Sequence, residues 1–152
     1  MRVENIRKAI GAIVYQNNKF LIINKTKMNT KEGKENIEGE WDFIKGGVEE
    51  EDDELVDSLL RELKEETGSE EYKVIKQFDE KICFDFPKSI QEKIGFVRQE
   101  TTMFFVEFLG NEKILTPFDN EVSDVKFLEK DKLLDTLTHS ETKEYFIKNV
   151  GI

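Results

Sequence analysis

Residues 61–68 read RELKEETG. Glu62, Glu65 and Glu66 are spaced i, i+3 and i+4, so on a helix they share one face. Like charges at this spacing repel one another by roughly a few tenths of a kcal/mol per pair. A hard divalent cation such as Mg²⁺ or Mn²⁺ is the usual agent that offsets this repulsion. The ordinary alternative is a solvated acidic helix surface.

The residues around this stretch predict a helix over about residues 53–67. At about 100° per residue, its leucines and valine form one apolar arc. Glu62 and Glu66 continue the line of that arc, so they should point toward the body of the protein. Glu65 lies at the polar edge, one turn beyond Arg61 and able to pair with it. Carboxylates that extend a core-facing stripe indicate a site rather than a solvated face.

The negative charge of the chain is concentrated around this helix. Twelve acids and two bases lie between Glu49 and Glu71, whereas the whole chain has 33 acids and 23 bases. The rest of the chain therefore balances at 21 of each, so the acidity is local and not a general solubility device. Part of the acidic run 49–54 can serve the helix N-terminus, where we expect Asp52 or Asp53 as the cap.

The length and the cysteine content indicate the class of protein. A chain of 152 residues is long enough for a proper core, and we expect residues 1–152 to form a single domain. The one cysteine, Cys83, excludes an internal disulfide and suits a reducing cytoplasm; we expect it to pack within a strand. Because no apolar run approaches ~18 residues and residues 1–4 do not resemble a signal peptide, we expect a soluble, cytoplasmic domain without a membrane partner.

Apolar runs separated by polar segments predict the order of the other elements. Strands are expected at residues 9–15 and 20–24, joined as a hairpin, and at 41–44, 72–78, 81–86, 100–109 and 125–128. The polar segments 25–40 and 87–99 are expected to be long loops, and residues 130–150 to form two short helices separated near His139. This order predicts an α/β (α+β) fold with a mixed sheet flanked by helices.

From residue 47 onward the chain resembles the signature of the Nudix hydrolases, G-x5-E-x7-R-E-U-x-E-E-x-G-U, in which U is aliphatic. Seven fixed positions match at the right separations: Gly47, Arg61, Glu62, Leu63, Glu65, Glu66 and Gly68. Asp53 stands at the first glutamate of the signature and Ser69 at the last aliphatic position. An alternative alignment starts from Gly46 and inserts one residue in the acidic run. The resemblance implies a Nudix-type α/β/α sandwich with a mixed sheet between helices.

The resemblance also implies a chemistry, the hydrolysis of a pyrophosphate bond in a nucleoside diphosphate linked to another group. Glu62, Glu65 and Glu66 would hold Mg²⁺ (or Mn²⁺), and a carbonyl near Gly46 could complete the metal shell. Arg61 would orient a carboxylate of the loop and helix. Since the substrate is a polyanion that approaches an acidic region, bound cations are needed to invert the local field, and they also polarise a phosphoryl oxygen and orient water.

Further residues are expected to contact the substrate. Gly46 and Gly47 would let it approach the backbone closely. Lys45 would face phosphates, unless it is an ordinary exposed lysine, and Arg98 is a second candidate for substrate binding. Glu121 matches a loop glutamate that serves as a metal ligand or general base in the diadenosine tetraphosphate hydrolases and RNA 5′-pyrophosphohydrolases; the alternative is an ordinary loop acid.

Residues 41–49, WDFIKGGVE, resemble the W-x-F-P-K-G-x-x-E motif of the asymmetric diadenosine tetraphosphate hydrolases, with Ile44 in place of proline. We therefore expect a nucleotide polyphosphate as substrate, first of all a dinucleoside tetraphosphate. The alternatives are a triphosphorylated RNA 5′ end, a nucleoside triphosphate, ADP-ribose, or a Nudix-fold domain that binds nucleotide without turnover. The lysines of residues 25–34 and 88–98 form no compact basic stripe, which disfavours generic nucleic-acid binding. No feature of the sequence specifies an oligomeric state.

Overall fold

The computed structural model describes residues 5–30, 33–49, 54–115 and 122–150. Its strands are β1 (Ile6–Gln16), β2 (Lys19–Thr30), β3 (Gly33–Asp42), β4 (Ile44–Gly47), β5 (Tyr72–Gln77), β6 (Ile82–Asp85), β7 (Arg98–Phe108) and β8 (Val122–Glu129). Its helices are α1 (Leu55–Thr67), α2 (Lys88–Ile94), α3 (Lys130–Thr136) and α4 (Ser140–Asn149), with a 3₁₀ turn, η1, at Glu112–Ile114.

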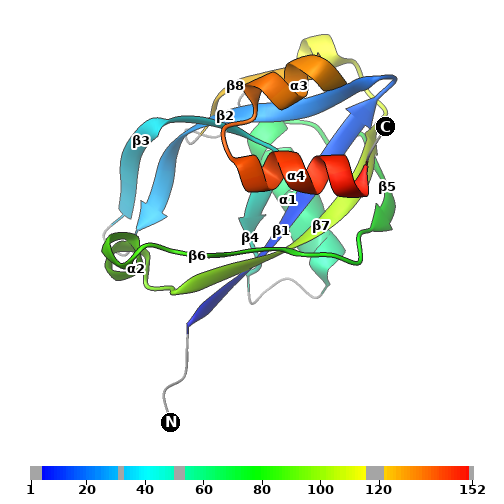
Figure 1. Cartoon of the computed structure of the whole chain (residues 1–152). Coiled ribbons are helices and arrows are strands. Elements are labelled where there is room, and N and C mark those ends of the chain that lie inside the picture. The colour runs from blue at the N-terminus through cyan, green and yellow to red at the C-terminus, as the bar shows by residue number, and fades with distance from the viewer. Residues whose placement is uncertain (1–4, 31–32, 50–53, 116–121, 151–152) are drawn as a thin grey trace.

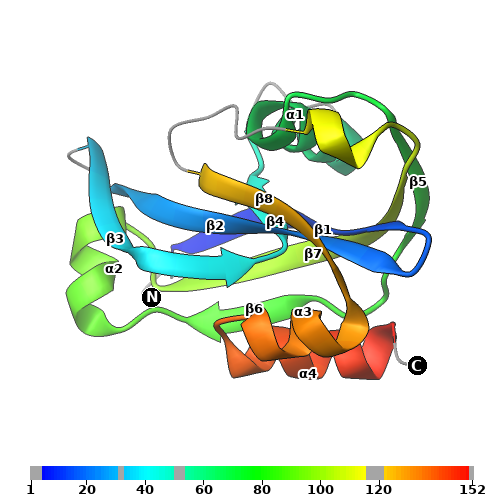
Figure 2. The same ribbon diagram turned by 90° about the horizontal axis from the view of Figure 1, so that it is seen from above.

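The strands form one mixed sheet (Figure 1). Its order is β3-β2-β1-β7-β5, with β4 paired to β1, β6 to β7 and β8 to β2. The pair β1 and β7 is parallel, with Ile6 beside Arg98 and Tyr15 beside Glu107, and the other pairs are antiparallel. Seen from above, α1 lies on one side of the sheet and α3 and α4 lie on the other (Figure 2). The expected sandwich of helices around a mixed sheet is confirmed.

Side chains that alternate along β1 build a core on each face of the sheet. Ile10 packs on the α1 side with Leu59 and Leu63 of that helix. Ile13 packs on the opposite side with Phe146 of α4. Successive side chains of a strand point to opposite faces, so one strand supports both layers of helices.

The predicted acidic helix is confirmed as α1, and its ends are fixed by local hydrogen bonds. The backbone N–H of Glu54 donates to the Asp57 carboxylate at 3.1 Å. At the other end, Gly68 adopts the left-handed conformation with a φ of 75°, which glycine takes without strain. The N-cap is Glu54, so the expectation of Asp52 or Asp53 in this role was wrong; both of those residues lie outside the described part of the chain.

Both segments that were expected to be long loops contain regular structure, so those expectations were wrong. Within residues 25–40, β2 continues to Thr30 and β3 begins at Gly33, and the two residues are paired across the hairpin. Backbone pairing stabilises these polar strands, which carry no apolar alternation that could have predicted them. Residues 87–99 contain α2, which is capped at its C-terminus by Gly95 with a φ of 84°, and the first residues of β7.

The remaining predicted elements have mixed outcomes. The hairpin over residues 9–24, the strands near residues 72–78, 100–109 and 125–128, and the two C-terminal helices separated at His139 are confirmed. Residues 41–44 belong to the end of β3 and the start of β4 rather than to one strand. Cys83 is exposed, so the expectation that it packs was wrong; only Ile82 is buried in the short strand β6. No helix in the described segments is long and apolar enough to cross a membrane.

Candidate active site

Glu62 lies against the glycine pair at the end of β4. Gly46 pairs with Ile10 of β1, whose side chain packs on the α1 side of the sheet. A Cβ atom built on Gly46 would lie 2.1 Å from Cδ of Glu62, so any larger residue at position 46 would collide with the carboxylate. The Glu62 side chain is only 12% exposed. Its predicted direction, toward the body of the protein, is confirmed.

Arg61 joins the helix to the loop that precedes it. Its Nη2 donates to the carbonyl of Gly47 at 3.2 Å, and its Nη1 donates to Oε1 of Glu62 at 3.0 Å. The same Nη1 lies 3.6 Å from Oε2 of Glu65 and 3.5 Å from Oε1 of Glu49. The predicted pair with Glu65 is therefore confirmed, and one guanidinium offsets part of the repulsion among three carboxylates.

The other two predicted metal ligands have contrasting surroundings. Glu66 is 1% exposed, as its place on the core-facing stripe predicts, whereas the Glu65 side chain is 47% exposed. In the part of the chain that the structure describes, no three Asp, Glu, His or Cys side chains are gathered as metal ligands. Oxygen donors of this kind nevertheless fit Mg²⁺ or Mn²⁺ chemically, and the absence of a side chain at Gly46 leaves the Glu62 carboxylate against open backbone.

The surroundings of Glu62 oppose its ionisation. Burial, and next the negative charge of Glu65, raise the pKa of Glu62 to about 7, although Arg61 and Lys25 act in the opposite direction. A carboxylate with such a pKa is one whose charged form a nearby cation would stabilise. The effect of Lys25 was not predicted, because this residue was expected to lie in a long loop and not in β2.

A second arginine beside the glycine pair was also missed. The Nη1 atom of Arg7 donates to Oε1 of Gln99 at 2.6 Å, and its Nη2 lies 3.0 Å from where a Cβ on Gly47 would be. Gln99 is buried and donates to the Thr101 hydroxyl at 3.1 Å, which fixes the position of the amide. Arg7 and Gln99 are neighbours in register between β1 and β7, a pairing that the sequence alone did not specify.

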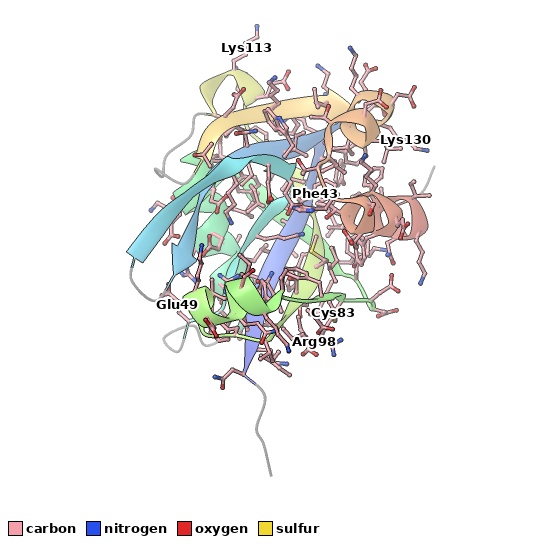
Figure 3. The ribbon with its side chains drawn as sticks, turned by 60° about the vertical axis from the view of Figure 1, so that its left-hand side comes forward. Phe43, Glu49, Cys83, Arg98, Lys113 and Lys130 are labelled. Atoms are coloured by element: carbon pink, nitrogen blue, oxygen red, sulfur yellow. The ribbon has the colours of Figure 1, made fainter. Side chains whose placement is uncertain are left out.

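The other predicted substrate contacts lie in separate surroundings. Lys45 is only 12% exposed and its Nζ lies 3.0 Å from Oδ2 of Asp42, so it is not an ordinary exposed lysine. Arg98 lies at the end of the molecule where β1 begins (Figure 3), with Nε 4.0 Å from Oδ1 of Asp85. The α1 residues and the glycine pair are thus brought together, whereas these two cations are paired with other acids. Glu121 lies outside the described residues.

Comparisons with known proteins identify the family of this chain. The NUDIX domain model matches residues 5–150. An RNA pyrophosphohydrolase from a Nitratiruptor species is 34% identical over 116 residues, which cover 71% of this chain and 74% of that protein. The crystal structure of the MutT protein from Methanosarcina mazei has a TM-score of 0.72 at 16% identity, covering 97% of this chain and 95% of that one.

An Ap4A hydrolase from C. elegans has a TM-score of 0.65 at 18% identity and covers 93% of both chains. At such identities the two solved structures show the fold alone. The family match and the bacterial relative show the family as well, because they cover most of the chain. This chain therefore belongs to the Nudix family of pyrophosphohydrolases.

Proposed function

We propose that this chain hydrolyses the 5′-triphosphate end of RNA in a reaction that depends on Mg²⁺ (or Mn²⁺). The observation that carries the chemistry is the Glu62 carboxylate, which is 12% exposed, lies against the backbone of Gly46 and accepts a hydrogen bond from Arg61. The substrate class is supported by the bacterial relative, whose name is RNA pyrophosphohydrolase and which is 34% identical over 71% of this chain. We therefore rank an RNA end ahead of a dinucleoside tetraphosphate, the reverse of the order expected from the sequence motif.

The residues that would hold the cation are Glu62, Glu65, Glu66 and the backbone carbonyl of Gly46. When bound, the ion would polarise a phosphoryl oxygen and lower the pKa of a water molecule. Arg61 donates to Glu62 and to the carbonyl of Gly47, so its role is to position the carboxylate relative to the glycine pair. Burial of Glu66 restricts its side chain, which favours a fixed direction for its oxygen atoms.

Positive charge near the glycine pair and near Glu62 would help a polyanion to approach. Arg7 lies next to Gly47, and Lys25 is close enough to lower the pKa of Glu62. We propose that these two residues act with Lys45 and Arg98 on the phosphate groups. Lys45 lies 3.0 Å from the Asp42 carboxylate and Arg98 lies 4.0 Å from that of Asp85, so a bound phosphate would compete with those acids.

Glu121 is proposed as a further metal ligand or general base. This role follows from the resemblance in the loop before the last strand, and the residue lies outside the described part of the chain. Replacement by glutamine removes the charge at nearly constant volume. We expect Glu121→Gln to lower kcat more than it raises KM, because a base or metal ligand acts mainly on the chemical step.

Product analysis with a panel of substrates tests the proposal. The purified protein is incubated with triphosphorylated RNA, diadenosine tetraphosphate, a nucleoside triphosphate and ADP-ribose, with Mg²⁺ or with EDTA. We expect Mg²⁺-dependent release of phosphate groups that leaves a monophosphate on the RNA, faster than turnover of the other compounds. A preference for diadenosine tetraphosphate would favour the second candidate, which the motif at residues 41–49 supports. Nucleotide binding without any turnover would instead support a binding module.

A further inference from the structure

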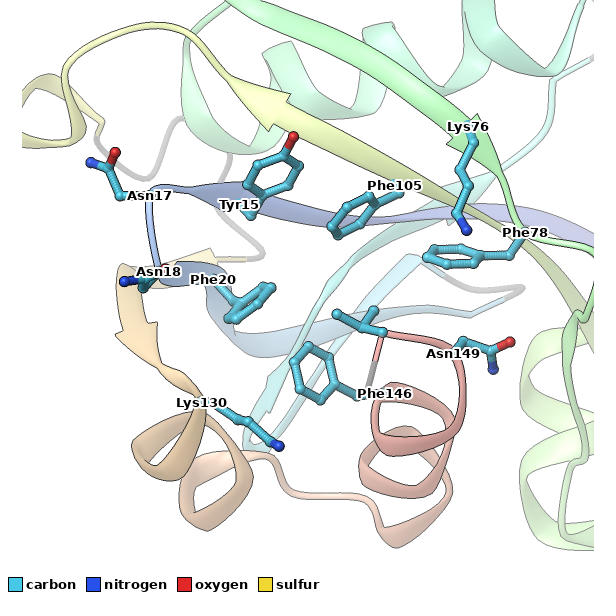
Figure 4. Close-up of a pocket in the computed structure, with 11 residues that line it drawn as sticks. Tyr15, Asn17, Asn18, Phe20, Lys76, Phe78, Phe105, Lys130, Phe146 and Asn149 are labelled. Carbon is cyan, nitrogen blue, oxygen red and sulfur yellow. The ribbon is translucent and has the colours of Figure 1, made fainter. Parts of the chain in front are cut away.

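A pocket of about 500 Å³ lies on the face of the sheet opposite α1, next to the β1–β2 hairpin and α4 (Figure 4). Its volume is in the range of sites for small molecules. Five aromatic residues, from β1, β2, β7, α4 and the position just after β5, line it: Tyr15, Phe20, Phe78, Phe105 and Phe146. Residues far apart in the sequence therefore converge on one hollow.

The rings of this pocket contact one another in defined geometries. Tyr15 and Phe105 stack with centroids 4.6 Å apart and planes at 19°. Phe20 meets Phe146 edge to face at 4.9 Å, and the centroids of Phe78 and Phe105 are 5.9 Å apart. Walls made of ring faces and edges favour a ligand that is itself planar and aromatic.

The charge of the pocket is opposite to that of the chain. Lys76 and Lys130 border it at opposite ends (Figure 4), and the Lys76 Nζ lies 5.1 Å from the centroid of the Phe78 ring. None of the described residues that line the pocket is an acid, in a chain with 33 acids and 23 bases. The acids Glu112 and Glu129 line an adjoining depression, which shares Asn17 and Asn18 with the pocket. Two ammonium groups beside aromatic walls favour an anionic ligand.

The pocket is remote from the candidate active site. Tyr15 is five positions beyond Ile10, the partner of Gly46 on β1, which corresponds to roughly 16 Å along a strand. The two sites also face opposite sides of the sheet, since Ile10 packs on the α1 side and Phe146 on the other. A ligand in the pocket would therefore not touch the α1 carboxylates.

We propose that this pocket is a second binding site that takes a small aromatic anion. The planar ring would lie among Tyr15, Phe20 and Phe105, and the acidic group at Lys76 or Lys130. A mononucleotide and an aromatic carboxylic acid share this chemistry. The proposal is independent of the reaction proposed for the α1 side, because it rests on a different set of residues.

A fluorescence titration with 8-anilinonaphthalene-1-sulfonate, an aromatic sulfonate that emits more strongly in apolar surroundings, tests the site. We expect saturable binding to the folded protein. The double variant Lys76→Gln/Lys130→Gln should bind at least about fivefold more weakly, as expected for the loss of two partly exposed charges. Lys132→Gln, at an exposed position of α3 outside the pocket, is the matched control and should bind like the unchanged protein. Thermal unfolding verifies that all variants are folded.

Displacement of the probe identifies the source of the ligand. We expect AMP or 1-naphthoate to displace it and adenosine, which has the ring of AMP without the phosphate, to require a higher concentration. Displacement by AMP would indicate a nucleotide, and displacement by 1-naphthoate alone an aromatic acid. Equal binding of the probe by the double variant and the unchanged protein, or displacement by neither anion, would overturn the proposal.

Discussion

The α1 face and the α3–α4 face of the sheet share the strands β1 and β7, yet they differ in the sign and the position of their charged groups. On the α1 face, Glu62 is a largely buried acid that accepts a hydrogen bond from Arg61 and lies against the backbone of Gly46. On the other face, Lys76 and Lys130 stand at the ends of an aromatic pocket. In the first site, burial opposes the ionised form of the carboxylate, whereas the second has its two ammonium groups at the rim of an apolar interior. Alternation along the strands allows one sheet to carry both.

The largest expected effect is the loss of turnover when a carboxylate on the α1 face is replaced. Glu65→Gln and Glu66→Gln should each lower turnover by on the order of 10² to 10³, because each removes one charge from the cation site at nearly constant volume. Steady-state kinetics with Mg²⁺ and circular dichroism measure activity and folding. Glu70→Gln, at an exposed acid 3.2 Å from Lys64 just after the helix, is the control and should retain activity. Near-normal rates in both site variants would refute the proposed metal role.

Alanine substitutions at Gly46 and Gly47 should differ in effect, because the space around the two positions differs. A Cβ at Gly46 would lie 2.1 Å from Glu62, whereas a Cβ at Gly47 would lie 3.0 Å from the flexible end of Arg7. We expect Gly46→Ala to lower stability by about 1–3 kcal/mol and to lower kcat severalfold or more by moving the carboxylate. Gly47→Ala should lower both the stability and kcat by a smaller amount. Chemical denaturation and kinetics compare the two, and equal effects would contradict the close packing of Glu62 on position 46.

The raised pKa of Glu62 predicts a pH dependence of stability. Burial raises the pKa from 4.5 to about 7, so between these values the folded state binds more protons at this position than the unfolded chain. The free energy of unfolding should therefore fall as pH rises through this window. As pH rises through this window, the unfolding free energy of the metal-free protein should fall by on the order of 2 kcal/mol more than that of Glu62→Gln.

Urea denaturation in EDTA at several pH values measures this difference. Excess Mg²⁺ should reduce the slope, because a bound cation favours the ionised carboxylate. Parallel pH profiles for the two proteins would show that Glu62 is not buried as described.

The smallest expected effect is on the α4 face. Tyr145 is buried and its hydroxyl donates to the carbonyl of Glu80 at 2.6 Å. Tyr145→Phe removes this hydrogen bond without removing the ring, so we expect a loss of about 1 kcal/mol in unfolding free energy and unchanged turnover. A large loss of turnover would show that the two faces are coupled.

Features that depend on neighbouring residues could be predicted from the sequence. The helix over residues 53–67, the inward direction of Glu62 and Glu66 and the mixed sheet follow from local spacing and from the family signature. The approach of Arg7 and Lys25 could not be predicted, because it depends on the register of β1 with β7 and on a polar strand β2 that lacks apolar alternation. The aromatic pocket is assembled from five separate elements.

Binding of Mn²⁺, followed by the loss of the free-ion signal in electron paramagnetic resonance, is the most direct test of a cation site at the α1 carboxylates. The unchanged protein should bind Mn²⁺ and release it to excess Mg²⁺. Glu66→Gln should weaken binding by at least about tenfold, since ligand charge sets the affinity of such sites, and Glu70→Gln should not. Equal affinity in all three proteins, or no binding by the unchanged protein, would contradict a metal site on α1.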